Sequence, residues 1–192
     1  MRHVDKKTHP TDRIGARIVY REYAEARGAL IDLLGEYCSF CEMQLDASLA
    51  VEHVQPKSKV SALATSWENF LLACTNCNST KGNRHIVLGD YVWPDRDNTV
   101  LCLQYGPGAL VRVAVSLTDP TIRERTQNTI NLVGLDWNPS KPKTRTAASS
   151  EGRDTASDRR WRNRQEKWYI AIDAYRDLDA SIREAGNNSL AT

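Results

Sequence analysis

The first helix of the chain is predicted by its apolar spacing. Apolar residues recur at steps of three and four between Arg17 and about Glu36, as they do on one face of an α-helix. Gly35 is expected to end this helix, because glycine is common just past helix C-termini. Residues 1–16 are polar, carry Pro10 and show no periodicity, so we expect them to form an N-terminal arm.

Two short apolar runs in the middle of the chain predict a pair of strands. Residues 50–54 contain β-branched valines, and residues 70–73 are apolar throughout. A loop is expected between them at residues 57–66. A short helix should follow, with Thr75 or Asn76 as its N-cap. The predicted order is strand, loop, strand, helix.

The second half of the chain predicts a β-hairpin and two helices. Apolar blocks at residues 99–105 and 110–115 flank a turn rich in glycine and proline, as in a hairpin. A helix is then expected to open at Pro120 and to run through Val133, with Gly134 at its C-terminal end.

The C-terminal part divides into a linker and a final helix. Residues 138–158 lack an apolar pattern and are rich in Ser, Thr and Pro, which favours a flexible linker or loop. The helix is expected from about Ser157 to Glu184. Large side chains follow one side of it: Trp161, Trp168, Ile172, Tyr175 and Ile182. Helical spacing of this kind favours packing on a domain over stacking on nucleic-acid bases.

Composition limits the class of protein. The 192 residues suit one domain with additions, and no run approaches the roughly 18 apolar residues of a membrane span. The N-terminus is charged and lacks the apolar segment of a secretory signal, so we expect a cytoplasmic protein without membrane association.

Charge is distributed unevenly along the chain. The formal net charge is only +2, but residues 1–28 carry +3, residues 138–167 carry +5 and residues 29–137 carry −4. Basic segments of this kind attract nucleic acid, or they are simply solvated faces, and the sequence leaves both interpretations open.

The cysteines indicate a metal site. Cys38/Cys41 and Cys74/Cys77 form two CxxC pairs separated by 32 residues. Two such turns supply the four thiolates of a structural zinc site, which leaves no open coordination position. Unrelated cysteine pairs and a redox pair are the weaker alternatives. Cys102 lies in an apolar run and is expected to be a buried core thiol.

The polar residues between the cysteine pairs suggest hydrolytic chemistry. Glu52 offers a carboxylate oxygen suited to Mg²⁺ or Mn²⁺, and Asn78 offers a neutral carbonyl oxygen. Two protein ligands leave positions for water and a phosphate oxygen. A histidine such as His53 beside that metal can accept a proton from the attacking water, although a lone histidine is more often structural.

Basic residues flank this segment. Lys57, Lys59, Lys81 and Arg84 offer contacts to the phosphates of a nucleic acid, and solvated side chains are the alternative. Lys81 is the strongest candidate, because it lies one helical turn from Asn78.

Taken together, these motifs resemble the HNH endonuclease family, in its subgroup with a zinc-binding cysteine quartet. The resemblance spans residues 38–82, about a quarter of the chain. Four separately spaced elements carry it: Cys38-x-x-Cys41, Glu52-His53-Val54-x-Pro56-Lys57-Ser58, Trp67-x-Asn69-x-Leu71, and Cys74-x-x-Cys77-Asn78-x-x-Lys81.

The resemblance implies an α+β fold with a ββα-metal core and a structural zinc, flanked by an N-terminal helix, a β-hairpin and C-terminal helices. It implies that His53 is the general base and that Asn69 holds the loop after His53 by a hydrogen bond. Glu52 and Asn78 would bind one catalytic Mg²⁺ or Mn²⁺. The products would carry 5′-phosphate and 3′-hydroxyl ends.

Two positions depart from the familiar pattern. Glu52 stands where related sites often carry Asp, and Asn78 stands where many members carry His. Both keep an oxygen ligand available, so they alter metal geometry and preference more than they question activity.

The expected organisation follows from the resemblance. A nuclease domain at 17–137, with its motif core at 38–82, lies between the arm and the linker, and a helix at 159–185 packs on the core or on a partner. We expect a metal-dependent endonuclease that cuts DNA, with RNA as the alternative substrate, in bacterial defence or restriction beside an ATPase or another defence protein. A non-catalytic, zinc-stabilised module that binds nucleic acid or a protein partner is the alternative.

Overall fold

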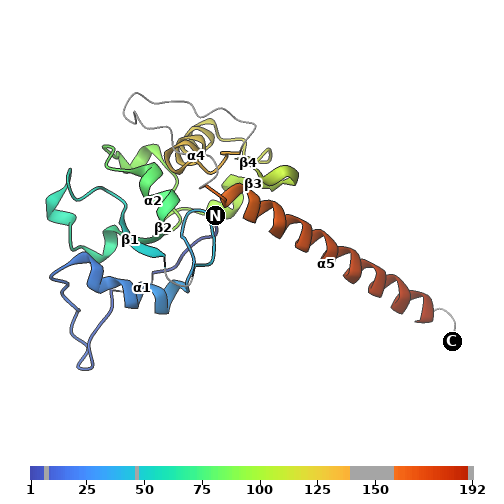
Figure 1. Ribbon diagram of the computed structural model, residues 1–192, viewed down its shortest axis with the longest axis horizontal. Coiled ribbons are helices and arrows are strands. Elements are labelled where there is room, and N and C mark those ends of the chain that lie inside the picture. The colour runs from blue at the N-terminus through green and yellow to red at the C-terminus, as the bar shows by residue number, and fades with distance from the viewer. Residues whose placement is uncertain (7–8, 46–47, 139–157, 190–192) are drawn as a thin grey trace. The chain divides into compact units, whose positions relative to one another are not determined.

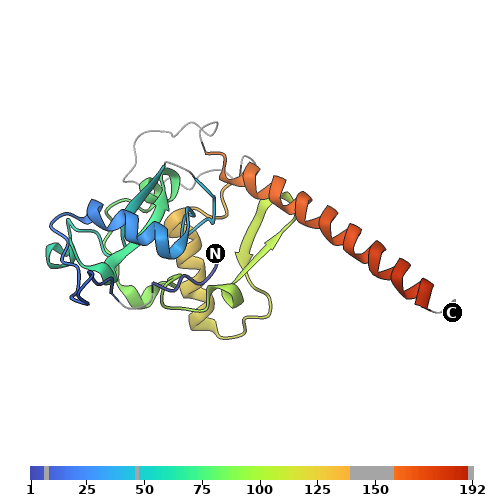
Figure 2. The same ribbon diagram turned by 90° about the horizontal axis from the view of Figure 1, so that it is seen from below.

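The computed structural model describes residues 1–6, 9–45, 48–138 and 158–189. It is a mixed α and β structure with two small two-stranded sheets, β1–β2 and β3–β4 (Figures 1 and 2). The α-helices and strands are α1 (Arg27–Leu34), β1 (Leu49–His53), β2 (Phe70–Cys74), α2 (Thr75–Lys81), α3 (Thr99–Cys102), β3 (Leu103–Gly106), β4 (Leu110–Val113), α4 (Pro120–Val133) and α5 (Arg160–Ser189). The predicted α+β class with a ββα core is confirmed.

The chain forms two compact units. One comprises residues 1–104 and 111–137, and the other comprises residues 105–110 and 138–192. The first contains every site residue predicted from the sequence. The boundaries 17–137 for a nuclease domain stay a prediction.

The ββα core forms where the sequence predicts it. β1 and β2 are antiparallel, and their register pairs Leu49 with Cys74 and His53 with Phe70. Every residue of β2 is buried, which explains its uninterrupted apolar sequence. α2 follows β2 directly and packs against both strands.

The N-cap of α2 is a correction to the sequence prediction. Cys74, rather than Thr75 or Asn76, occupies this position, because its backbone is extended and its sulfur accepts a hydrogen bond from the Cys77 N–H at 3.4 Å. A residue of the predicted cysteine quartet therefore also starts the helix.

The first helix is shorter than predicted. A 3₁₀ turn covers Tyr23–Ala26, and α1 begins only at Arg27 rather than at Arg17. The side chains of Glu22 and Glu25 form a capping box that starts the turn there, so the preceding residues stay outside the helix. Gly35 ends α1 with φ of +74°, as expected.

The predicted hairpin is also shorter than expected. Residues 99–102 form the short helix α3, and β3 begins at Leu103. Cys102 is buried, as predicted, and its thiol donates to the carbonyl oxygen of Asn98. α4 matches its predicted bounds, since Asp119 caps its start and Gly134 ends it in the left-handed conformation.

The beginning of the chain differs from the expected arm. Met1, Val4 and Lys6 are buried. The N–H of Val4 donates to the carbonyl oxygen of Pro94 at 2.8 Å, and the hydroxyl of Thr99 donates to the carbonyl oxygen of Met1 at 3.0 Å. Met1, Val4 and Lys6 are therefore part of the core of this unit, whereas Arg2, His3 and Asp5 are exposed.

In the second unit, α5 packs against the 3₁₀ turn Pro107–Ala109, and the guanidinium of Arg164 donates to the carbonyl oxygen of Ala109 at 3.3 Å. The helix runs past its predicted end, to Ser189. Most of the predicted linker lies outside the described residues, and the packing of α5 on the core or on a partner stays a prediction. None of the described helices combines the length and apolar character that a membrane span requires.

Candidate active site and metal centre

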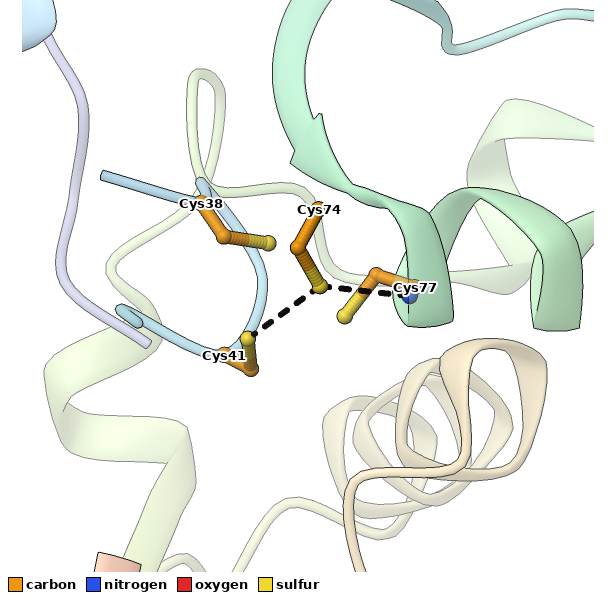
Figure 3. Close-up of side chains that lie close together, drawn as sticks. All are labelled: Cys38, Cys41, Cys74 and Cys77. Atoms are coloured by element: carbon orange, nitrogen blue, oxygen red, sulfur yellow. Dashed lines mark hydrogen bonds between the residues drawn. The ribbon is translucent and has the colours of Figure 1, made fainter. Parts of the chain in front are cut away.

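Four buried thiols converge between the turn at residues 38–41 and the start of α2 (Figure 3). The sulfur atoms of Cys38, Cys41, Cys74 and Cys77 all lie within 4.8 Å of one another. Those of Cys41 and Cys74 are 3.7 Å apart. A zinc ion with Zn–S bonds of about 2.3 Å has ligand atoms about 3.8 Å apart, so the cluster fits a tetrahedral site. The predicted cysteine quartet is confirmed.

The electrostatics of this cluster also favour a cation. The pKa of Cys74 is lowered, because neighbouring thiols, Cys38 foremost, donate hydrogen bonds to its sulfur. The pKa of Cys77 is raised well above its usual value, because its thiol hydrogen-bonds to Cys38 and the other two sulfurs and is buried. Four thiolates would repel one another here, and a dication at their centre removes that conflict.

His53 ends β1 in a defined tautomer. Its Nε2 lies 2.9 Å from the carbonyl oxygen of Ala64, which can only accept, so Nε2 carries the proton. Nδ1 is then the basic nitrogen, and it has no partner among the described residues. The ring packs edge-on against Tyr23 and Phe70, with centroid distances of 5.0 and 5.3 Å.

Burial sets the charge of this imidazole. The pKa of His53 is lowered from its usual 6.5, mainly because burial disfavours the charged form, although the bond to Ala64 opposes this effect. The lysines Lys57 and Lys81 lower it further. The ring is therefore neutral at physiological pH, as a proton acceptor must be.

Asn69 connects the two ends of the loop that follows His53. Its Oδ1 accepts from the N–H of Gln55 at 2.8 Å, and its Nδ2 donates to the carbonyl oxygens of Gln55 at 2.9 Å and Leu63 at 3.2 Å. Because Leu63 adjoins Ala64, the same side chain steadies the carbonyl that orients His53. Asn69 is itself buried, which protects these bonds from water.

Glu52 is held by a buried lysine. The ammonium of Lys81 lies 2.7 Å from Glu52 Oε1 and donates to the carbonyl oxygen of His53 at 2.7 Å. Both side chains are buried. The pKa of Glu52 is raised, because the desolvation of its carboxylate outweighs the opposing effect of Lys81.

The side chain of Lys81 is therefore not on the surface, where the sequence analysis expected it to contact phosphates. The side chain is 0% exposed, so its ammonium is not free to meet a phosphate. α2 turns this residue towards β1, where Glu52 needs a counterion. The helical spacing that linked Lys81 to Asn78 could not show this, because it gives no information about the partner strand.

The proposed ligands of a catalytic metal come from adjacent elements. Glu52 belongs to β1, and its Oε2 has no protein partner in the parts of the chain that the structure describes. Asn78 belongs to α2, is partly buried, and its side-chain amide makes no bond to any described residue. One carboxylate oxygen and one amide oxygen are therefore available, a donor set that suits Mg²⁺ or Mn²⁺.

The remaining basic candidates are exposed. Lys57, Lys59 and Arg84 all face solvent. Lys57 places its ammonium 4.1 Å from the centre of the Tyr23 ring, which also contacts the His53 ring. Tyr23 was missed by the sequence analysis, because it was assigned to a helix core and no motif contains it.

These features define a ββα unit tied by a thiol cluster, with a histidine and a carboxylate at the end of its first strand. The family model of HNH endonucleases matches residues 36–84, which include all of these site residues except Tyr23. Residues 36–84 thus match the HNH endonuclease family, and the resemblance noted in the sequence is confirmed. A comparison with curated proteins found no match.

Proposed function

We propose that this protein is a metal-dependent HNH endonuclease that hydrolyses phosphodiester bonds of DNA. The observation that carries the proposal is the geometry of His53: Nε2 lies 2.9 Å from the carbonyl oxygen of Ala64, and Nδ1 has no partner among the described residues. Burial lowers the pKa of the ring, which favours the neutral form that can accept a proton.

The residues would act in a fixed order. Nδ1 of His53 accepts a proton from water as the water oxygen attacks phosphorus, and the bond from phosphorus to the 3′ oxygen breaks. The 3′ oxygen takes up a proton from a solvent water, which leaves 3′-hydroxyl and 5′-phosphate ends, and His53 later returns its proton to solvent. The carbonyl of Ala64 holds the imidazole in place and stabilises its charged form after proton transfer. Asn69 keeps that carbonyl in position.

Glu52 and Asn78 would hold one Mg²⁺ or Mn²⁺, which supplies positive charge to the scissile phosphate and to the leaving oxygen when bound. The thiol cluster would hold zinc with a purely structural role, because four sulfur ligands fill its coordination sphere. Two observations support this ligand pair. Glu52 Oε2 and the side-chain oxygen of Asn78 have no partner among the described residues, and the two residues belong to the neighbouring elements β1 and α2.

One observation favours the alternative of a non-catalytic, zinc-stabilised binding module. Lys81 already balances the charge of Glu52, so this carboxylate is satisfied without a metal. A role in bacterial defence or restriction, beside an ATPase or another protein, remains part of the proposal on the strength of the family resemblance. The cytoplasmic location expected from the sequence is also part of the proposal.

Plasmid cleavage by the zinc-loaded protein tests the proposal. With Mg²⁺ or Mn²⁺ we expect nicked and linear products from the wild type and at least about a hundredfold less from His53→Ala, since general-base catalysis contributes about 10²–10⁴-fold. His85→Ala is the matched control, because His85 is exposed and has no bond to a described residue. Equal cleavage by His53→Ala would refute the assigned base. Absence of cleavage in every metal would favour the binding module.

A further inference from the structure

A short hairpin projects from the unit that holds the active site. Thr11 and Arg17 form an antiparallel bridge, and the N–H of Asp12 donates to the carbonyl oxygen of Ala16 at 2.8 Å. The carboxylate of Asp12 accepts from the N–H groups of Ile14 and Ala16, both at 2.9 Å. Residues 11–17, which we name the tip hairpin, are therefore an ordered turn, seen in blue at the lower left of Figure 1.

The composition of the tip hairpin is unusual for a solvated turn. Ile14, at its end, is 88% exposed, and Val19, beyond its base, is 85% exposed. The side chains of Arg13, Arg17 and Arg21 are exposed and have no acidic partner among the residues that the structure describes. The carboxylate of Asp12 is bound to backbone N–H groups and does not pair with these arginines. The exposed face of the tip hairpin therefore carries arginines, with an aliphatic side chain at its end.

The base of the tip hairpin is fixed to the active site. His9 and Tyr20 flank the hairpin, and both rings pack against Trp67, at centroid distances of 6.0 and 6.1 Å. Tyr20 also contacts Phe70 at 6.3 Å. Phe70 in turn packs against His53. The hairpin and the proposed general base are therefore supported by the same buried ring.

We propose that the tip hairpin enters a groove of duplex DNA next to the bond that is cut, with Arg13 and Arg17 on phosphates and Ile14 against the bases. This inference rests on the proposed nuclease function and names its substrate contact. Unpaired arginines complement a polymer that carries one negative charge per about 1.7 Å of duplex. Exposed aliphatic side chains beside arginines are used by other proteins to enter DNA grooves.

The geometry favours DNA over RNA duplexes. A narrow turn closed by one bridge, such as the tip hairpin, fits the major groove of B-form DNA, which is about 12 Å wide, and aliphatic wedges fit its minor groove. The major groove of A-form RNA is deep and narrow, and its minor groove is too shallow to enclose a projecting turn. The tip hairpin should therefore discriminate between duplexes of identical sequence.

Equilibrium binding in the His53→Ala background tests this inference without cleavage. The zinc-loaded protein is titrated onto a labelled DNA duplex at several salt concentrations. Replacing both Arg13 and Arg17 with Gln should lower the slope of log affinity against log salt by about 2, because each lost phosphate contact removes about one unit. Arg112→Gln is the matched control, since Arg112 is an exposed arginine of the same unit and has no bond to any residue that the structure describes.

Ile14→Ser should weaken DNA binding about three- to tenfold and leave the salt slope unchanged, since it removes apolar contact but no charge. Val115→Ser is its control, because Val115 is similarly exposed, at 72%. Thermal unfolding should be unaltered by each change. Wild-type affinity and slope in the hairpin variants, or losses equal to those of the two controls, would overturn the inference. Equal competition by an RNA duplex of the same sequence would overturn the preference for DNA.

Cleavage of a small phosphodiester, bis(p-nitrophenyl) phosphate, separates this inference from the proposed function. Hairpin variants of the active protein should hydrolyse this compound at the wild-type rate while they cut duplex DNA more slowly. If the wild type hydrolyses neither substrate but still binds DNA through the hairpin, the catalytic proposal fails and the inference stands. If the wild type cuts DNA and the hairpin variants match it in cleavage and binding, the inference fails alone.

Discussion

The buried pair of Glu52 and Lys81 gives the sharpest prediction about stability. Lys81→Met removes an ammonium that is 0% exposed and leaves the Glu52 carboxylate, 7% exposed, without its counterion. It also removes the donor to the His53 carbonyl oxygen. Breaking a buried ion pair from one side costs about 3–5 kcal/mol, so we expect the free energy of unfolding to fall by about 4 kcal/mol.

The sign of the pH dependence follows from Glu52. Its pKa is already raised in the folded state, chiefly by desolvation, and Lys81 opposes that rise. A group with a raised folded pKa binds its proton more tightly when folded, so its contribution favours folding at low pH and is lost as the pH rises through the folded pKa. Without Lys81 the pKa rises further, and the deficit of Lys81→Met should therefore be smaller at pH 5 than at pH 7.5.

Urea unfolding of zinc-loaded wild type and variant at both pH values measures the deficit, and comparison at equal pH cancels the effect of acid on the zinc site. The double variant Glu52→Gln/Lys81→Met should be more stable than Lys81→Met alone, because the buried charge is gone. A deficit below about 1 kcal/mol would show that the pair behaves like a surface ion pair. A deficit independent of pH would show that the charge of Glu52 is not its cause.

Three further predictions concern the supports of the site. Cys74→Ser should lose zinc and most of its thermal stability, since zinc contributes about 10–16 kcal/mol in small zinc domains, while Cys102→Ser, a buried cysteine outside the cluster, should retain the metal by elemental analysis. NMR titration of the Mg²⁺-free protein should give a pKa below 6.5 for His53. Because the folded state resists protonation of this ring, the free energy of unfolding should fall as the pH drops below 6.5. A pKa at or above 6.5 would contradict the burial argument. The ammonium of Lys6 contacts Asp95 at 2.8 Å and the carbonyl oxygens of Glu68 and Phe70, on either side of Asn69, at 3.0 Å. Lys6→Met should therefore lower the free energy of unfolding in urea by about 3 kcal/mol and should slow cleavage. Unchanged unfolding would show that these contacts are dispensable.

Local chemistry made much of the core predictable. Cysteine spacing identified the quartet, because thiols three residues apart in a turn must point to one centre. The strands and α2 followed from short apolar runs and from Gly82, which ends the helix with φ of +61°. Each of these features is set by residues a few positions apart, so each can be predicted from a short stretch of the sequence.

Long-range partners were less predictable. Lys6 lies more than 60 residues from the backbone oxygens that it contacts, and nothing in the charged N-terminal sequence indicates a buried ammonium. Lys81 pairs with a residue 29 positions away, on a strand whose burial only the fold establishes. Polar residues near a site are usually solvated. Lys6 and Lys81 are buried instead, because each ammonium binds a buried carboxylate and backbone carbonyl oxygens.

The cysteine cluster and Lys81 together hold both ends of α2 in place. Cys74 and Cys77 tie its beginning to the turn at residues 38–41, and Lys81 ties its end to β1. Asn78 lies between these attachments, one residue after Cys77 and three before Lys81. A helix of seven residues has little stability of its own, so both attachments are needed to present this amide to a metal. Loss of zinc should therefore abolish cleavage even where the β-strands persist, although a zinc ion held by four thiolates would have no coordination position for the substrate.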